Sequence, residues 1–269
     1  MFNDWLRRKT LTPIVYEGPS LGVERANWKL KPSQKILDLK ICDPAMGSAA
    51  FLVQTCRWLA DRLVEAWSEA EQNGAFFDAD GTVIIKEAEG EVGLLPQSTS
   101  ERIVVARRLI AERCLYGVDM NPLAVELAKL SLWLTTISKG YPFGFLDHNL
   151  KCGNSLLGLT NAGQLINLSM DGKAGAQGLL FGREIEGALE EATGIRENLR
   201  SVPIRDIGDV HRMVHLDLRA KDCLKTPILL ADALVGIELA EINAASKLAR
   251  LSELAALSDN AINGDIHSL

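Results

Sequence analysis

Apolar and polar positions follow two alternating patterns along the first 160 residues of the chain. A short apolar run over 37–43 predicts a buried strand, and the spacing of three and four residues over 49–72 predicts one apolar helix face. The same succession returns with a strand at 115–119, a helix at 122–137 and a third strand near 149–152. The predicted stripes are Leu52, Cys56, Leu59, Leu63 and Trp67 in the first of these helices, and Leu123, Leu127, Leu130, Leu134 and Ile137 in the second.

The segments before, between and after these elements do not follow the same pattern of apolar residues. Pro13, Pro19 and Pro32 prevent any long element before residue 38. Glycines interrupt the pattern over 74–97 and flank the apolar run 82–85, which predicts a small β-hairpin, followed by a helix that begins at Ser98 or Ser100. Beyond residue 159 the sequence predicts helices at 184–199 and within 206–257, and no further clear strand.

This succession predicts the fold class and the division of the chain. Strands that alternate with helices are typical of an α/β fold in which a parallel sheet is flanked by helices. We expect an N-terminal segment over 1–38, an α/β domain over 39–159 with the hairpin insertion at 74–97, and a helical insertion or lobe over 160–269.

Composition and charge reduce the number of functional classes to which the chain could belong. The net charge is −6 and the basic residues are dispersed, so the chain shows no DNA-binding face of its own. No apolar run is long enough to span a membrane, and the N-terminus lacks the order of a signal peptide. The five cysteines form no Cys-x-x-Cys pair, which favours reduced, largely buried thiols in a cytoplasmic protein over disulfides or a zinc site.

The candidate chemistry lies where the three predicted strands end, because ligands of open α/β sheets bind at the carboxyl ends of strands. Asp43 is followed by a tight loop of small residues that leads into a helix N-terminus, a place that favours a negative group. Asp119 ends the second strand and could accept hydrogen bonds from ribose hydroxyls, or it could cap the next helix. Asn154 follows the third strand and could read a purine edge, or it could satisfy its own turn.

Together these strand ends resemble the cofactor motifs of adenine-N6-specific DNA methyltransferases. Residues 43–52 read Asp-Pro-Ala-Met-Gly-Ser-Ala-Ala-Phe-Leu, similar to the family motif D-P-A-x-G-S-G-x-F-L. Residues 116–128 look like the second motif with its helix, and 152–158 look like the third. The likeness is closest to the large methylases of restriction–modification and phage-defence systems. Residues 11–15 resemble the remains of the segment that precedes the first motif there.

The resemblance implies a fold, a cofactor and a set of contacts. The fold would be a Rossmann-like S-adenosylmethionine-dependent methyltransferase fold, incomplete and with a helical C-terminal segment. Asp43 and the loop after it would surround the methionine part of S-adenosyl-L-methionine. Asp119 would hold the ribose hydroxyls, Met120 would pack on the adenine, and Asn154 would lie near the adenine amino edge. The loop residues in this set are Pro44, Ala45, Met46, Gly47 and Ser48.

The sequence departs from the family motifs at two places, and each departure leads to a further expectation. Ala49 stands where the family has glycine, so a positive φ there would cost on the order of 1 kcal/mol and weaken cofactor binding. The chain has nine prolines and no two are adjacent, so it lacks the Asn/Asp-Pro-Pro-Tyr/Phe loop that holds the flipped adenine. We therefore expect no catalytic residues in this chain, which would stop before that loop. DNA would be bound through a missing C-terminal part, with a catalytic, target-recognition or restriction subunit as a further partner.

Three other interpretations stay open on the sequence alone. A split methyltransferase could supply the cofactor half here and the catalytic loop on another chain, with the helical lobe as its interface. A nicotinamide-dependent dehydrogenase shares the strand-end acid, but the first loop lacks Gly-x-Gly-x-x-Gly. His211 and His215 are four residues apart and could bind a metal, although a solvated helix face explains them as well.

Overall fold

A computed structural model describes the chain over most of its length. The described residues are 12–18, 22, 24–79, 81–84, 94–137, 146–171, 182–201, 206–240 and 243–262. The chain divides into two compact units, one comprising residues 1–154 with 203–210 and the other comprising 155–202 with 211–269.

The first unit is built on a parallel three-stranded sheet. Its strands are β3 (Ile41–Asp43), β6 (Leu115–Asp119) and β7 (Leu150–Cys152), in the order β3-β6-β7. Ile41 pairs with Leu115, and Gly117 pairs with Leu150. Parallel neighbours need a crossover connection, and the helices between these strands provide it. The expected α/β class with a parallel sheet and flanking helices is confirmed.

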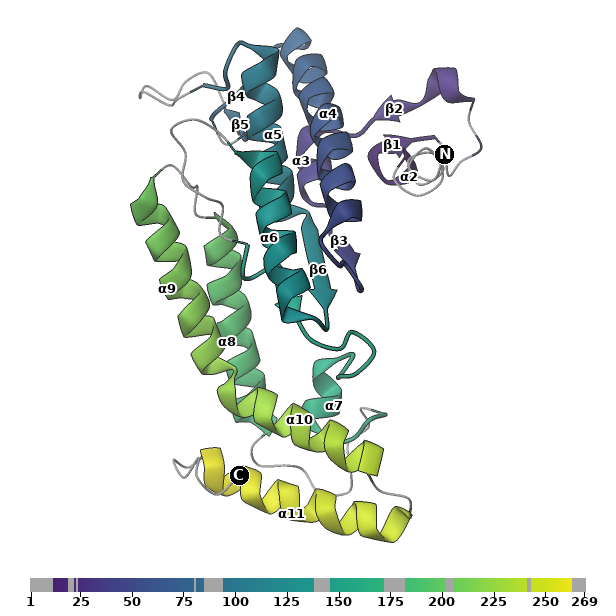
Figure 1. Ribbon diagram of the computed structural model, residues 1–269, viewed down its shortest axis with the longest axis vertical. Helices are drawn as coiled ribbons and strands as arrows, with labels where there is room; N and C mark the ends of the chain where they lie inside the picture. The colour runs from purple at the N-terminus through teal and green to yellow at the C-terminus, as the bar shows by residue number, and fades with distance from the viewer. Residues whose placement is uncertain are drawn as a thin grey trace. The chain divides into compact units, whose positions relative to one another are not determined.

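Three long helices pack with this sheet, as Figure 1 shows. They are α4 (Ala50–Gln72), α5 (Thr99–Arg113) and α6 (Pro122–Thr136), each close to the start predicted from the apolar spacing. In α4 the predicted stripe is fully buried, from Leu52 to Trp67. These side chains form one hydrophobic core with Leu109 and Ile110 of α5 and Leu115 of β6. The removal of this apolar surface from water makes the largest contribution to the stability of the unit.

The predicted strand over 37–43 is correct only at its end. Helix α3 (Ser33–Leu37) occupies the beginning of that run, and Asp38–Lys40 connects it to β3. Ile36 and Leu37 are buried in the core as helical residues. A short apolar run does not distinguish a buried strand from a buried helix, which is why the prediction was wrong here.

The sequence pattern predicted the wrong face of α6 (Pro122–Thr136) as the buried one. The buried residues of this helix are Val125, Ala128 and Leu132. The predicted leucine stripe is exposed instead. The exposed residues are Leu123, Leu127, Leu130, Leu134 and Ile137.

Two small antiparallel pairs complete the first unit. After α2 (Thr12–Val15), β1 (Tyr16–Glu17) pairs with β2 (Lys29–Leu30), and η3 (Arg25–Asn27) lies between them. In the 74–97 region, β4 (Phe76–Phe77) pairs with β5 (Val83–Ile84). Phe77 is buried against Trp67 of α4, with ring centroids 6.3 Å apart, so this hairpin is anchored on the core.

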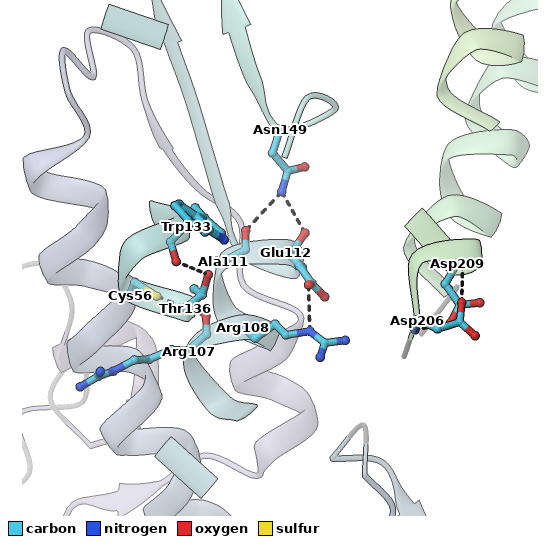
Figure 2. Close-up of polar contacts among 10 residues, drawn as sticks. All are labelled: Cys56, Arg107, Arg108, Ala111, Glu112, Trp133, Thr136, Asn149, Asp206 and Asp209. Atoms are coloured by element: carbon cyan, nitrogen blue, oxygen red, sulfur yellow. Dashed lines mark hydrogen bonds and ion pairs between the residues drawn. The ribbon is translucent and has the colours of Figure 1, made fainter. Parts of the chain in front are cut away.

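The second unit is helical. It contains α7 (Ala162–Ile166), α8 (Gly182–Ser201), α10 (Lys225–Ala240) and α11 (Ala244–Ile262). Helix α9 (Ile207–Cys223) crosses the division, and Figure 2 shows Asp206 and Asp209 in the reciprocal hydrogen bonds that begin it. A separate small core holds the unit together; its buried members are Leu165, Leu168, Ile185, Leu230 and Leu254.

One buried charge in this unit has its partners in the same unit. The carboxylate of Asp217, which is almost fully buried, lies 2.6 Å from the Lys221 ammonium and 3.8 Å from the Arg196 guanidinium. Within the described ranges, none of the helices is both long and apolar enough to cross a membrane.

Candidate functional site

The carboxyl ends of the three parallel strands lie next to one another in the first unit. Asp43 pairs in register with Gly117 of β6, and Asp119 pairs with Cys152 of β7. The two predicted acids therefore end neighbouring strands, and Asn154 follows the third strand by two residues. Asp43 and Asp119 are half-buried, and Asn154 is exposed.

Both acids accept hydrogen bonds from backbone amides in the loop after β3. Asp43 Oδ1 accepts from the N–H of Ala45 at 3.1 Å, which closes a turn at the end of its own strand. Asp119 Oδ2 accepts from the N–H of Gly47 at 2.9 Å. The second bond joins residues from different strand ends, so it fixes the loop against β6.

The same loop is held to β6 by its own backbone. The N–H of Met46 donates to the carbonyl of Val118 at 3.0 Å, and the N–H of Ala49 donates to the carbonyl of Met46 at 2.8 Å. The side chain of Met46 is buried. Pro44, Ala45 and Ser48 are exposed.

Gly117 makes room for the Met46 side chain. A Cβ at position 117 would lie 2.2 Å from Met46 Sδ, with methyl groups of Leu52 and Leu150 at 3.1 and 3.3 Å. Real Cβ atoms do not approach other atoms so closely, because repulsion rises steeply below contact distance. A glycine in the middle of β6 is therefore required by this packing.

Ala49 has the positive φ that the sequence comparison suggested. Its φ is +65° and its ψ is +28°, the left-handed conformation, and it directly precedes the first residue of α4. Its methyl group is fully buried. Gly47, two residues earlier, has φ +53° with open space where a Cβ would lie.

The Asp119 carboxylate is also tied to the start of α6. Asp119 Oδ1 accepts from the N–H of Asn121 at 2.9 Å, and Asn121 Oδ1 caps the helix by accepting from the N–H of Leu123 at 3.0 Å. The backbone donors of Asn121 and then Gly47 hold the pKa of Asp119 below its usual range. Asp119 is thus an ionised group near neutral pH, next to a helix N-terminus.

The third strand end is joined to the second. The N–H of Gly153 donates to the carbonyl of Asp119 at 2.9 Å, and Cys152 Sγ lies 3.6 Å from the carbonyl of Met120. The side chain of Met120 is 70% exposed. An exposed thioether beside a carboxylate is a surface on which a flat ring could pack.

Sequence reasoning missed Asn149, which fixes where β7 begins. Figure 2 shows its side-chain amide between two carbonyls at the end of α5: Nδ2 lies 3.4 Å from the oxygen of Ala111 and 2.9 Å from that of Glu112. Its backbone carbonyl accepts from the N–H of Gly117. The last carbonyls of a helix have no partner within the helix, so this buried amide both caps α5 and positions β7. Its place at the start of the predicted strand near 149–152 gave no signal of this role.

The histidines and cysteines were the other candidates for polar chemistry in the sequence. His211 and His215 are both exposed on α9, and across the described ranges no group of three metal-ligating side chains occurs. Cys56 and Cys114 are buried, and burial raises the pKa of each thiol to about 12. Cys42 and Cys152 are exposed, so the expectation of largely buried thiols holds only in part.

The geometry defines an α/β protein with polar groups gathered at one edge of a parallel sheet, compatible with a Rossmann-like fold. No protein-family model matches the chain, and no solved structure matches it. The chain is 27% identical over 129 residues to a protein of Methanocaldococcus jannaschii that is named as a type II restriction enzyme and methyltransferase. The match covers 45% of this chain and 9% of that relative, so the chain spans only a small part of the relative's length.

Proposed function

We propose that this chain binds S-adenosyl-L-methionine as the cofactor part of a restriction–modification methyltransferase that modifies adenine N6 in DNA. The similarity to the Methanocaldococcus jannaschii protein supports the class of methyltransferase in general. The observation that carries the proposal is the hydrogen bond from the Gly47 amide to the Asp119 carboxylate. This bond holds the loop after β3 and the end of β6, which carry the first and second motifs, next to each other at the carboxyl ends of the strands.

Each residue of the site has a role in this proposal. The loop over 44–48 surrounds the methionine part, and the Asp119 carboxylate accepts hydrogen bonds from the ribose hydroxyls. Met120 packs on the adenine, and Asn154 lies near its amino group. Asp43 shapes the loop through the Ala45 amide. When bound, the cofactor supplies an activated methyl group on its sulfonium.

The fit of the residues to this cofactor rests on their donor and acceptor chemistry. Ribose hydroxyls donate to a carboxylate, and Asp119 remains charged because its pKa is lowered by backbone donors. The site is partly exposed, so a ligand can reach it: Met120 and Asn154 lie on the surface. The loop over 44–48 has no negative side chain of its own, which suits a methionine carboxylate near the start of α4.

The methyl transfer itself would need groups beyond this site. The chain contains no adjacent prolines and so provides no Asn/Asp-Pro-Pro-Tyr/Phe loop. We propose that the catalytic loop and the DNA-reading surface are supplied by other residues of a longer protein or by a partner chain. Such a protein would flip the adenine and orient its amine at the methyl carbon.

Isothermal titration with S-adenosyl-L-methionine tests the proposal. The wild-type chain should bind, and Asp119→Ala should lower the affinity at least tenfold. Asp61→Ala is the matched control, because Asp61 is an exposed carboxylate on α4 away from the strand ends, and it should bind as the wild type does. A folded wild-type chain that does not bind, or equal binding by Asp119→Ala, would contradict the proposal.

A further inference from the structure

The last turn of α5 is bound by side chains from the starts of two strands. The final carbonyls of a helix have no partners within the helix, so they accept hydrogen bonds from outside it. Lys40, which directly precedes β3, donates from Nζ to the carbonyl of Arg113 at 2.8 Å. Asn149, which directly precedes β7, donates from Nδ2 to the carbonyls of Ala111 and Glu112, as Figure 2 shows. Because β6 begins two residues after α5 ends, this turn connects all three strands at their amino ends.

Strand β3 has further attachments besides the bond of Lys40. The N–H of Ile41 donates to the carbonyl of Cys114 at 2.8 Å, and Cys114 Sγ lies 3.5 Å from the carbonyls of Ile36 and Leu37. Ile36 and Leu37 are themselves buried in the core. Loss of the Lys40 bond alone should therefore leave β3 in place.

Strand β7 depends more strongly on the residue that precedes it. It has three residues, and Leu150 is its one buried side chain. The register of a strand with so few buried side chains is weakly specified, and a slip by one residue turns every side chain to the other face of the sheet. Asn149 is 2% exposed and opposes such a slip with two groups. Its Nδ2 binds the end of α5, and its backbone carbonyl accepts from the N–H of Gly117 in β6 at 3.1 Å.

The hydrogen bonding of Asn149 favours a positioning role over a purely stabilising one. Within the described ranges no donor reaches its Oδ1, and a buried acceptor without a partner is destabilising. An apolar side chain of similar size would avoid this loss, but it could not bind the carbonyls at the end of α5. The amide at position 149 therefore contributes a fixed place for β7 more than it contributes stability.

The carboxyl end of β7 leads into the residue that the proposed function places at the adenine. Cys152 pairs in register with Asp119, and the N–H of Gly153 donates to the carbonyl of Asp119 at 2.9 Å. Asn154 follows directly. A slip of β7 by one residue would move Asn154 by about 3.3 Å along the strand and would break the bond of Gly153.

We propose that Asn149 is a positioning residue for the ligand selectivity of this site. By fixing β7, it holds Asn154 where the side chain can bind the amino group of the adenine. This role rests on the proposed function, because the adenine belongs to the cofactor. Asn149 does not contact the ligand, since it lies at the amino end of β7 and the site lies at the carboxyl end. Its loss should therefore weaken the discrimination between purines, and not only the affinity.

Titration calorimetry with two ligands tests the role of Asn149. The ligands are S-adenosyl-L-homocysteine and its analogue with hydrogen in place of the adenine amino group. The wild-type chain should bind the first about 10-fold more tightly, as expected for one hydrogen bond. Asn149→Leu, which fills a similar space without a donor, and Asn149→Ala should both lose most of this preference. Lys40→Ala is the matched control, because it removes another cap of α5, and it should keep the full preference.

Hydrogen exchange without ligand gives a second measurement. The Gly153 N–H should exchange faster in both Asn149 variants than in the wild type, and Lys40→Ala should leave its rate unchanged. A folded wild type that binds neither ligand would contradict the proposed function, and this role would fall with it. A wild type that binds both ligands equally well, or a folded Asn149→Leu chain that keeps the wild-type preference, would overturn the role of Asn149 alone.

Discussion

The carboxylate of Asp119 at the end of β6 accepts a hydrogen bond of 2.9 Å from the backbone N–H of Gly47, in the loop that follows β3. The other carboxylate oxygen accepts from the N–H of Asn121 at the start of α6. One side chain thus connects a loop, a strand and a helix.

Removal of the Asp119 carboxylate should loosen the loop after β3. In Asp119→Ala the Gly47 amide loses its acceptor, so its hydrogen exchange should accelerate. Asp119→Asn keeps an oxygen acceptor and should show a smaller effect. Asp43→Ala is the matched control, because it removes the acceptor of Ala45 instead. Unchanged exchange at Gly47 in Asp119→Ala would refute the connection.

The stabilisation by Asp119 should depend on pH in one direction. Backbone donors lower its pKa in the folded chain, so the contribution is fully present above the ordinary pKa of the carboxyl group and is lost as the pH falls through the lowered value. The difference in urea midpoint between the wild type and Asp119→Asn should be constant from neutral pH to about pH 5 and should shrink below about pH 4. A difference that grows on acidification would show the opposite sign.

Substitution of Gly117 should be costly because of Met46. A Cβ at position 117 would meet Met46 Sδ at 2.2 Å, so Gly117→Ala should lower the free energy of unfolding by about 1–3 kcal/mol. Gly153→Ala is the control, since nothing lies within 4 Å of that position, and it should have little effect. Denaturation of the Gly117→Ala, Met46→Ala and double variants measures the coupling. If the two costs simply add, the contact with Met46 is not the cause.

Ala49 tests the cost of a positive φ next to α4. Ala49→Gly relieves about 1 kcal/mol of left-handed strain but removes a buried methyl group worth roughly 0.8 kcal/mol, so the free energy of unfolding should change by less than ~1 kcal/mol. Ala49→Val should destabilise by about 2 kcal/mol or more, because a branched side chain disfavours positive φ and the position is fully buried. In the proposed function, Ala49→Gly should also tighten cofactor binding in calorimetry. Equal stability of the glycine and valine variants would show that φ is not strained.

The periodic parts of the sequence predicted the fold well. Helix α4 and strand β6 were expected at the positions where they occur, because their apolar residues follow one period without interruption. The strand ends were also expected to lie side by side, since successive parallel strands bring their carboxyl ends to one edge. Asp43 and Asp119 are therefore neighbours, as their order in the chain implies.

Features that depend on contacts between distant residues could not be predicted. Leu37 belongs to a helix and not to the expected strand because tertiary packing decided its conformation. The leucine stripe of α6 is exposed while Val125, Ala128 and Leu132 are buried, and the apolar spacing in the sequence allowed either face to pack on the core. The bonds of Asn149 to the end of α5 and of Asp119 to Gly47 join residues far apart in the sequence, where no local pattern gives a signal.

The pairing of β3 with β6 sets the order in which the protein can fold during synthesis. Residue 41 meets residue 115, so β3 leaves the ribosome well before its hydrogen-bonding neighbour exists. Helices α4 and α5 can form and pair first, because their contacts are more local, whereas sheets with distant partners close slowly. Until α5 is complete, Asn149 has no carbonyls to bind and β7 has no fixed starting point. Nascent chains that pause between residues 43 and 115 would carry β3 without its hydrogen-bonding neighbour.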